Sequence, residues 1–225
     1  AGTISKYRRD LTAFARWLDG RAVTKESATA WKACLLNRDY APRTINSMLA
    51  AVNGFCRFAG LPIKLKFLSI QRQIFRDSSR ELTKEEYDRL LAAARESGQE
   101  RLALIMETLC ATGIRVSELR YITVEAALAG RATITLKGKI RTILLPAKLC
   151  RKLVKYARKQ KTASGEIFLT KSGRPITRRQ VWYELKRLCR AAGVEPTKVF
   201  PHNLRHLFAT TFYRASRDIV RLADM

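Results

Sequence analysis

The stretch His202-Asn203-Leu204-Arg205-His206 contains both histidines of the 225-residue chain, with an arginine between them. In a helix, residues three and four positions apart share a face, so Arg205 and His206 would both align with His202. A guanidinium offers phosphate oxygens a planar fork of donors, and an imidazole can donate, accept or shuttle a proton near neutral pH. The spacing therefore predicts a helical face that handles phosphate. A histidine satisfied within the core is the simpler alternative, which this clustering weakens.

The net charge of +25 is unusual, although the hydrophobic content of 47% is that of an ordinary globular protein. Residues 1–75 carry 13 basic and 4 acidic side chains, and residues 76–225 carry 31 and 15. Because both parts are basic, we expect both to contact one polyanion, nucleic acid. A solvated basic surface and an anionic membrane are the weaker alternatives. No apolar run approaches the roughly 20 residues that span a bilayer.

The cysteines are scattered along the chain, and none forms a C-x-x-C pair. Most have apolar neighbours, which predicts reduced thiols in or near the core of a cytoplasmic protein. Neither their spacing nor the supply of histidines fits a zinc site. The five are Cys34, Cys56, Cys110, Cys150 and Cys189.

Hydrophobic spacing predicts a small helical domain at the start of the chain. Its three helices would run from Thr3 to Gly20, from the N-cap Thr24 to Asn37, and from Pro42 to Gly60. A short piece over residues 63–70 is compatible with either a helix or an extended segment. The polar residues 71–80 are interpreted as an interdomain linker.

The rest of the chain predicts further helices and one β-hairpin. Capping boxes open two of the helices, and Gly113 stops another. The predicted helices cover 82–97, 100–112, a brief piece with Arg115 and Glu118, a basic stretch after Pro146, 177–192, and the segment after Pro201. The predicted strands are 132–136 and 142–145, joined by a turn at 137–140, and a short strand at 167–170. The predicted fold is therefore mostly α, with a small hairpin in a second domain.

The last residues begin a pattern that has no stop signal. Ser216-Arg-Asp is typical of a helix start, and an apolar face follows it up to Met225. A helix normally ends with glycine, proline or a polar tail. We therefore expect the chain to be a fragment of a longer protein.

Two further clusters accompany the histidines. Arg115 and Glu118 are three positions apart, so the carboxylate can orient the guanidinium. Lys137, Lys139 and Arg141 lie on or near the predicted hairpin turn, from which a lysine can reach into a groove. Taken singly, the first cluster is better explained as a surface ion pair and the second as a charged hairpin tip.

Two kinds of motif are missing from the sequence. No carboxylates are grouped as nucleases and polymerases group them around metal ions, and no G-x-x-x-x-G-K-[ST] phosphate loop occurs. What remains is phosphoryl transfer in which cationic side chains stabilise the charge on phosphorus. We therefore expect neither a metal nor another cofactor.

These motifs, in their order and spacing, resemble the tyrosine recombinase (phage integrase) family. They are Thr112-Gly-Ile-Arg-Val-Ser-Glu-Leu, the hairpin Lys-Gly-Lys-x-Arg, and His202-x-Leu-Arg-His-x-Phe-Ala-Thr, with Tyr7-Arg-Arg-Asp-Leu and Arg43-Thr-Ile-Asn matching nearer the start. The resemblance implies a helical core-binding (SAM-like) DNA-binding domain over 1–70, the linker over 71–80, and an incomplete α+β catalytic domain over 81–225.

The resemblance also implies catalytic roles. Arg115 and Arg205 would bind the non-bridging oxygens of the scissile phosphate, and Glu118 would support Arg115. His202 would assist proton transfer or hydrogen-bond the phosphate, whereas His206 would buttress the site.

The resemblance implies that the hairpin lysine protonates the leaving 5′-oxygen. Lys137 is the first choice and Lys139 the alternative, because this hairpin is one residue shorter than a common form in the family. In the family a tyrosine attacks the phosphate and forms a 3′-phosphotyrosyl link that conserves the energy of the DNA bond. Its place in the pattern lies beyond Met225, and Tyr213 is better explained by packing. We expect a site-specific DNA recombinase fragment that binds DNA but lacks its nucleophile.

Three other functions compete with this interpretation. A non-catalytic DNA-binding relative of the family is the first. An RNA-binding protein is weaker because no single-strand stacking motif is present. A type IB topoisomerase shares similar chemistry, but the length and two-domain pattern fit an integrase better.

Double-stranded DNA is thus the expected partner. A helix N-terminus that carries arginines suits phosphate binding, although surface charge is the alternative for each residue. The expected DNA contacts are Arg43, Arg72, Arg76, Lys139, Arg141, Arg178 and Arg179. By resemblance, the full-length protein would form a C-shaped clamp and a homo-tetramer at a synapse, and this fragment would be a monomer without DNA.

Overall fold

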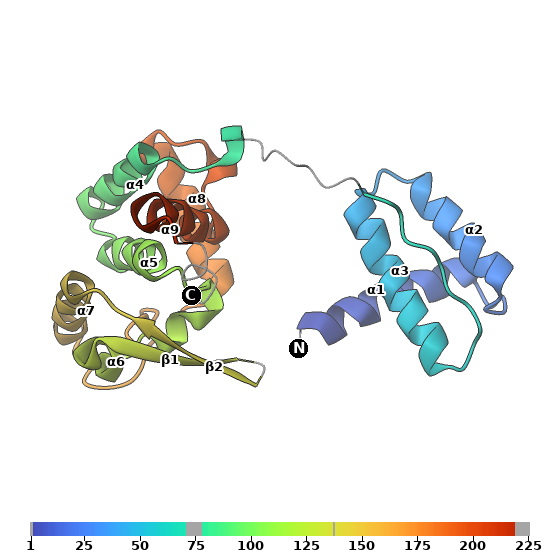
Figure 1. Cartoon of the computed structure of the whole chain (residues 1–225), viewed down its shortest axis with the longest axis horizontal. Coiled ribbons are helices and arrows are strands. Elements are labelled where there is room, and N and C mark those ends of the chain that lie inside the picture. Colours follow the sequence, from blue (N-terminus) through green and yellow to red (C-terminus); the bar gives the residue numbers. More distant parts are fainter. Residues whose placement is uncertain (1, 71–77, 137, 219–225) are drawn as a thin grey trace. The chain divides into compact units, whose positions relative to one another are not determined.

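The computed structural model describes residues 2–70, 78–136 and 138–218. The chain divides into two compact units, Ala1–Arg76 and Asp77–Met225 (Figure 1). The predicted fold class is confirmed, because helices dominate and the only sheet among the described residues is a two-stranded antiparallel one. None of the described helices is long and apolar enough to cross a membrane.

The first unit consists of the three helices that the hydrophobic spacing predicts. They are α1 (Gly2–Leu18), α2 (Lys25–Leu36) and α3 (Pro42–Phe58). Thr24 caps α2 through a reciprocal pair of hydrogen bonds with Ser27, which satisfies the free amides at the helix start. In the core, the rings of Phe14 and Trp31 stack with centroids 4.8 Å apart.

An extended segment follows α3 and is held by two asparagines of that helix. The Asn53 side chain donates to the Leu65 carbonyl at 2.9 Å and accepts from its amide at 2.8 Å. Asn46 makes the same pair of bonds with Leu68, at 2.9 and 2.7 Å. Each asparagine side chain thus satisfies a backbone amide and carbonyl that a neighbouring strand would otherwise pair with. Of the two predicted alternatives for 63–70, the structure therefore has the extended one.

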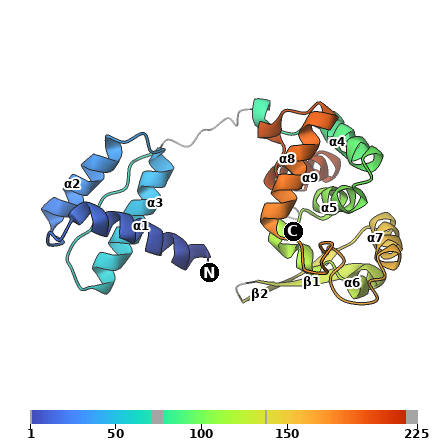
Figure 2. The same ribbon diagram turned by 180° about the vertical axis from the view of Figure 1, so that it is seen from behind.

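The second unit packs its longer helices around α5. These are α4 (Lys84–Glu96), α5 (Glu100–Thr112), α7 (Ala147–Lys159), α8 (Arg178–Ala192) and α9 (Pro201–Ser216). Helix α5 contacts the other four and buries residues on most of its surface, as expected of a central helix (Figures 1 and 2).

Shorter elements complete this unit. They are η1 (Ser78–Arg80), η2 (Val116–Tyr121), α6 (Val124–Ala129), β1 (Arg131–Leu136), β2 (Lys139–Leu144) and η3 (Pro196–Lys198). Helix α6 packs against α7 and β1, and the hairpin extends away from the helices (Figures 1 and 2). Part of the predicted linker, 78–80, is the 3-10 turn η1, and 71–77 lie outside the described residues.

Two strand predictions were wrong in detail. Leu136 pairs with Lys139, so Lys139 and Ile140 belong to β2 and not to the turn. Pairing continues up to a two-residue connection because Gly138 adopts the positive φ, 76°, that tight hairpin turns require. The predicted strand at 167–170 contributes only the isolated bridge of Leu169 to Pro175, since neither strand of the described part of the chain pairs with it.

Two further helix predictions concern the piece with Arg115 and Glu118 and the end of the chain. The first differs from the structure, and the second lies largely outside the described residues. Residues 116–121 form a 3-10 helix, with Arg115 as its N-cap rather than inside it. Helix α9 ends at Ser216, and Arg217 follows with φ at 54°. The residues that would continue a further helix, 219–225, lie outside the described part of the chain.

Candidate active site

The position of Arg115 is set by the end of α5. Gly113 terminates that helix with φ at 63°, and its amide donates to the Leu109 carbonyl at 3.0 Å. The Phe208 ring of α9 occupies the space where a Cβ at position 113 would lie. Glycine is therefore required both by the backbone conformation and by the close approach of α9. The chain turns sharply here and presents Arg115 at the start of η2.

Glu118 holds Arg115 through two contacts. Its Oε2 accepts the Arg115 amide at 2.7 Å, and its Oε1 lies 3.1 Å from the Arg115 guanidinium. The side chain of Glu118 is only 1% exposed, whereas that of Arg115 is 56% exposed. The carboxylate is thus buried behind a guanidinium that remains open to solvent and to a ligand.

A second arginine completes the neutralisation of Glu118. The Arg141 guanidinium, from β2, lies 2.6 Å from Glu118 Oε2. Burial opposes ionisation of Glu118, but the Arg115 amide and the charges of Arg141 and Arg115 outweigh it and lower the pKa of this carboxyl. Glu118 is therefore an anion at neutral pH that orients cations from two elements.

Helix α9, which lies far from Arg115 in the sequence, supplies Arg205 and His202. The Arg205 guanidinium donates to the Gly113 carbonyl, which ties α9 to the end of α5. Burial, and after it the charges of Arg115 and Arg141, lower the pKa of Arg205. An arginine stays charged even so, and its electrostatic cost would be relieved by an anion. His202 is exposed on the first turn of the same helix.

These side chains meet at a cavity of about 420 Å³. Arg115, His202 and Arg205 all line it, together with Arg178 from the first turn of α8. The remaining lining residues are Ile114, Val116, Ser117 and Pro201. Among the residues that the structure describes, no carboxylate lines this cavity, so its lining is cationic and suited to an anion such as a phosphate.

His206 and Arg179 lie beside the cavity residues in sequence but do not line the cavity. His206 Nε2 is 3.9 Å from Glu81 Oε1, and its side chain is half-buried. Arg179 is exposed next to Arg178. Arg43 is exposed in the first turn of α3, in the other unit.

The structure does not describe the side chains of the remaining predicted residues. Lys137, Arg72 and Arg76 lie outside the described residues, and of Lys139 only the backbone, at the start of β2, is described.

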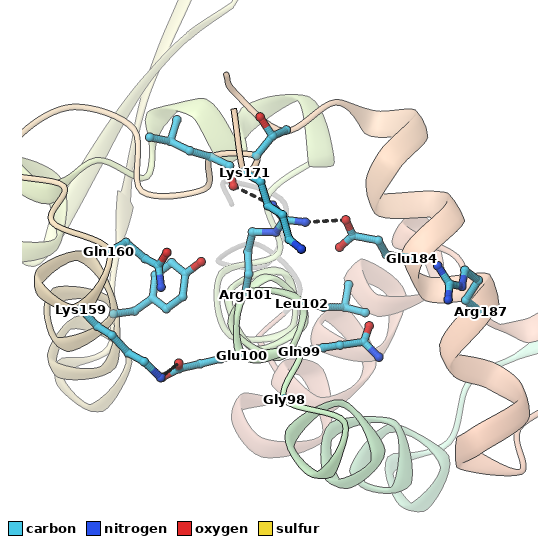
Figure 3. A pocket seen from close by; sticks show the side chains of 13 residues that line it. Gly98, Gln99, Glu100, Arg101, Leu102, Lys159, Gln160, Lys171, Glu184 and Arg187 are labelled. Atoms are coloured by element: carbon cyan, nitrogen blue, oxygen red, sulfur yellow. Dashed lines mark hydrogen bonds and ion pairs between the residues drawn. The ribbon is translucent and has the colours of Figure 1, made fainter. Parts of the chain in front are cut away.

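Another cavity in the second unit has a different character (Figure 3). It measures about 710 Å³ and is lined from α5, α7, α8 and the segment near Lys171. One of its two arginines, Arg101, is engaged by Glu184 at 2.5 Å and by the Leu169 carbonyl at 2.7 Å. Lys159 is likewise paired with Glu100 at 2.6 Å (Figure 3). Arg101 and Lys159 are thus paired with carboxylates that line the same cavity, whereas the Glu118 carboxylate that pairs with Arg115 does not line the cavity at His202.

Both parts of the chain match models of known protein families. Residues 80–225 match the model of the phage integrase family, and residues 1–60 match its N-terminal SAM-like domain. The chain belongs to the phage integrase (tyrosine recombinase) family. It is 30% identical over 230 residues to tyrosine recombinase XerA of Thermococcus kodakarensis, a match that covers 99% of this chain and 79% of the relative. It is 31% identical over 250 residues to XerD of Xanthomonas campestris, with 96% and 75% covered.

Solved structures of integrase-family proteins share the fold. The XerH recombinase bound to its difH substrate superimposes with a TM-score of 0.78 at 18% identity, covering 98% of this chain and 72% of that one. The lambda integrase tetramer bound to a Holliday junction gives 0.70 at 20% identity, covering 96% and 66%.

Sequence reasoning missed the structural roles of two residues at or near this cavity. Asn203 is buried, and its side-chain amide donates to the carbonyls of Arg80 at 2.7 Å and Lys198 at 2.8 Å. Its spacing of four from the buried Leu207 was a usable signal that it faces inward. Arg178 was predicted to contact DNA but not to line the cavity, because only the tertiary structure brings α8 beside α9.

Proposed function

We propose that the chain carries the phosphate-binding part of a site-specific DNA recombinase, which cuts and rejoins strands through a 3′-phosphotyrosyl link. The observation that carries this proposal is the convergence of Arg115, His202 and Arg205 on one cationic cavity of about 420 Å³. Residues 1–70 would serve as the core-binding domain, and residues 81–225 as the catalytic domain.

The arginines would act on the scissile phosphate. Phosphoryl transfer concentrates negative charge on the non-bridging oxygens, and fixed cations that are already in position stabilise it without reorganisation. Arg115 and Arg205 reach the cavity from different elements, so two forks can grip one phosphate from two sides. Glu118 keeps the Arg115 fork oriented, at 3.1 Å.

Proton transfer would be divided between the histidine and the hairpin lysine. His202 is exposed at the cavity and can hydrogen-bond the phosphate or move a proton at neutral pH. Lys137 remains the first choice for protonating the leaving 5′-oxygen, with Lys139 as the alternative. His206 would support the site from the side of Glu81.

None of the chain's seven tyrosines, all of which the structure describes, lines the cationic cavity. Tyr87 and Tyr156 are buried, and burial raises the pKa of both hydroxyls. The Tyr121 hydroxyl donates to the Thr135 carbonyl at 2.5 Å. Tyr213 is exposed two turns beyond His206. On these grounds the 225 residues would bind the DNA but not form the covalent intermediate by themselves.

A suicide DNA substrate tests that statement. Duplexes would first be selected from a random pool by binding to the chain, and a nicked version of the selected site would trap any covalent adduct. We expect no adduct on a denaturing gel. An adduct that disappears in Tyr213→Phe would identify that tyrosine as the nucleophile and overturn the proposal.

Double-stranded DNA would be the partner, and lambda integrase, which shares the fold, has been solved bound to DNA. The lambda integrase tetramer on a Holliday junction suggests that the full-length protein assembles as a homo-tetramer on DNA. The 225-residue chain alone would be a monomer, which sedimentation with and without the selected duplex would test.

Affinity for the selected duplex tests the cationic cavity itself. Arg115→Ala and Arg205→Ala should each weaken binding about tenfold, since a hydrogen bond between charged groups contributes about 1.5–3 kcal/mol. Arg158→Ala is the control, because Arg158 is exposed on α7 and does not line this cavity. If both cavity variants bind as tightly as the control, the cavity does not hold DNA phosphate.

A further inference from the structure

The β-hairpin is attached to η2 on both of its strands. On β1, the Thr135 carbonyl accepts the Tyr121 hydroxyl at 2.5 Å. On β2, the Arg141 guanidinium lies 2.6 Å from Glu118. The register pairs Ile134 with Arg141 and Thr135 with Ile140, so the two attachments lie on neighbouring rungs near the turn. Arg115 is the N-cap of the same element η2.

Arg141 was expected to contact DNA, but the structure gives its guanidinium a different partner. The Arg141 side chain is 25% exposed and the carboxylate that it meets is 1% exposed. Glu118 uses Oε2 for Arg141 and Oε1 for the guanidinium of Arg115. One buried carboxylate therefore joins a hairpin strand to a cavity arginine.

We propose that Arg141 is a positioning residue that fixes the hairpin relative to Arg115 through Glu118. The inference rests on the proposed function, because it concerns how the lysine-bearing turn and the phosphate-binding arginine are kept in register. It assigns Arg141 to the geometry of the site rather than to the DNA backbone.

The hairpin needs such an anchor for a physical reason. A two-stranded hairpin is only marginally stable by itself. Arg141 lies two residues beyond Lys139, which is about 7 Å along a strand, so an anchor there restrains the strand immediately after the turn. Glu118 also depends on this contact, because a buried carboxylate that loses one of its cations destabilises the folded state.

The coupling predicts that a change at Arg141 is felt at Arg115. In Arg141→Gln, Glu118 keeps its ion pair with Arg115, so the Arg115 guanidinium should reorient toward both carboxylate oxygens. Lysine at 141 retains the charge but lacks the planar fork, and should restore only part of the geometry.

The experiment compares four variants in the absence of DNA. They are Arg141→Gln, Arg141→Lys, Glu118→Gln and the charge-matched control Arg131→Gln, which alters an exposed arginine at the far end of the same hairpin. Amide hydrogen exchange over residues 131–144 reports hairpin anchoring. The ¹⁵N NMR signal of the Arg115 Nε–H group reports the state of the cavity arginine.

We expect exchange in the hairpin to be at least tenfold faster in Arg141→Gln and in Glu118→Gln, and intermediate in Arg141→Lys. The Arg115 signal should shift in Arg141→Gln, and the control should change neither observable. Unchanged exchange would overturn the anchor. Faster exchange with an unmoved Arg115 signal would overturn the coupling between Arg141 and Arg115. Arg141 would then stabilise only the hairpin.

A salt titration with the selected duplex separates the proposal from the DNA-contact interpretation. Loss of one phosphate contact lowers the slope of log K against log salt by about 0.9. We expect Arg141→Gln to leave the slope within about 0.3 of wild type. A fall of about one, with hairpin exchange unchanged, would make Arg141 a phosphate contact. Because exchange and NMR are measured without DNA, their outcome does not depend on whether Arg115→Ala weakens binding.

Discussion

At the scale of single residues, the site depends on a carboxylate that never faces the cavity. Glu118 is buried and ionised because cations from η2 and β2 converge on it. A pattern with arginine and glutamate three positions apart is usually a weak surface pair. Here the burial of Glu118 makes the pair consequential, since a carboxylate that is only 1% exposed is poorly solvated and depends on its protein partners.

Glu118→Gln should destabilise the fold by about 1.5–3 kcal/mol at pH 7, the usual size of a hydrogen bond to a charged group. The folded-state pKa of Glu118 is lowered, so its stabilisation is fully present above its ordinary pKa of 4.5 and is lost as pH falls through the lower folded-state value. Urea unfolding of wild type and variant from pH 7 to pH 3 should therefore converge at the acid end. A difference that is constant over this range would contradict ionisation as the cause.

Gly113→Ala should be more damaging than the same change at Gly130. Both glycines end a helix with positive φ, 63° and 69°, so each substitution costs about 1–2 kcal/mol of backbone strain. A Cβ at 113 would also collide with Phe208, whereas one at 130 meets nothing within 4 Å. Urea unfolding should give at least about 1 kcal/mol more loss at 113, in the range of overpacking. Equal losses would show that Phe208 moves aside freely.

At the scale of elements, α9 matters most, because it carries His202 and Arg205 and closes over the end of α5. The helix is fixed at its start by Asn203 and along its length by Leu204 and Leu207 in the core. Its polar and apolar residues therefore act together: the buried face sets the direction in which the phosphate-binding face points.

Asn203→Ala should loosen the start of α9. The two carbonyls of Arg80 and Lys198 would lose their donors in a buried setting, a cost of about 1–3 kcal/mol. Duplex affinity should also fall, because His202 is adjacent. Thr210→Ala is the control, since its hydroxyl bonds only to carbonyls of its own helix, His206 and Leu207. Unfolding and duplex binding measured on both variants would refute this role for Asn203 if the losses were the same.

The elements themselves were largely predictable from local signals. Thr83 and Thr177 each form the capping box that their spacing predicts, and Thr24 is the predicted N-cap of α2. Local signals failed where a neighbour decides the conformation. The extent of β2 depends on its pairing with β1, and residues 167–170 make only an isolated bridge because neither β1 nor β2 pairs with them.

At the scale of the whole molecule, the charge of +25 is distributed over both units. Phosphate binding releases counterions, so a chain that contacts DNA with both units should be strongly salt-sensitive. We expect log K for the selected duplex to fall against log salt with a slope of about −5 or steeper, which corresponds to six or more phosphate contacts. A flat response, measured by fluorescence anisotropy, would count against phosphate contacts.

Removing two charges at the start of α8 should reduce that slope. Arg178→Ala combined with Arg179→Ala is expected to make it shallower by about two, because each phosphate contact contributes about 0.9. The matched control is Lys148→Ala combined with Arg151→Ala, two exposed cations on α7 that do not line the cationic cavity. Equal effects of the two pairs would mean that the charge acts diffusely.

The sequence by itself determined the helices, the hairpin, the basic character and the chemical types of the site, because periodicity, caps and residue chemistry are local properties. Only the tertiary structure decided which cations meet. Gly113 and Phe208 bring α9 against the end of α5, so that Arg205 lies with Arg115, and β2 folds back so that Arg141 reaches Glu118 rather than solvent. Such contacts depend on packing between segments far apart in the chain, which no local pattern encodes.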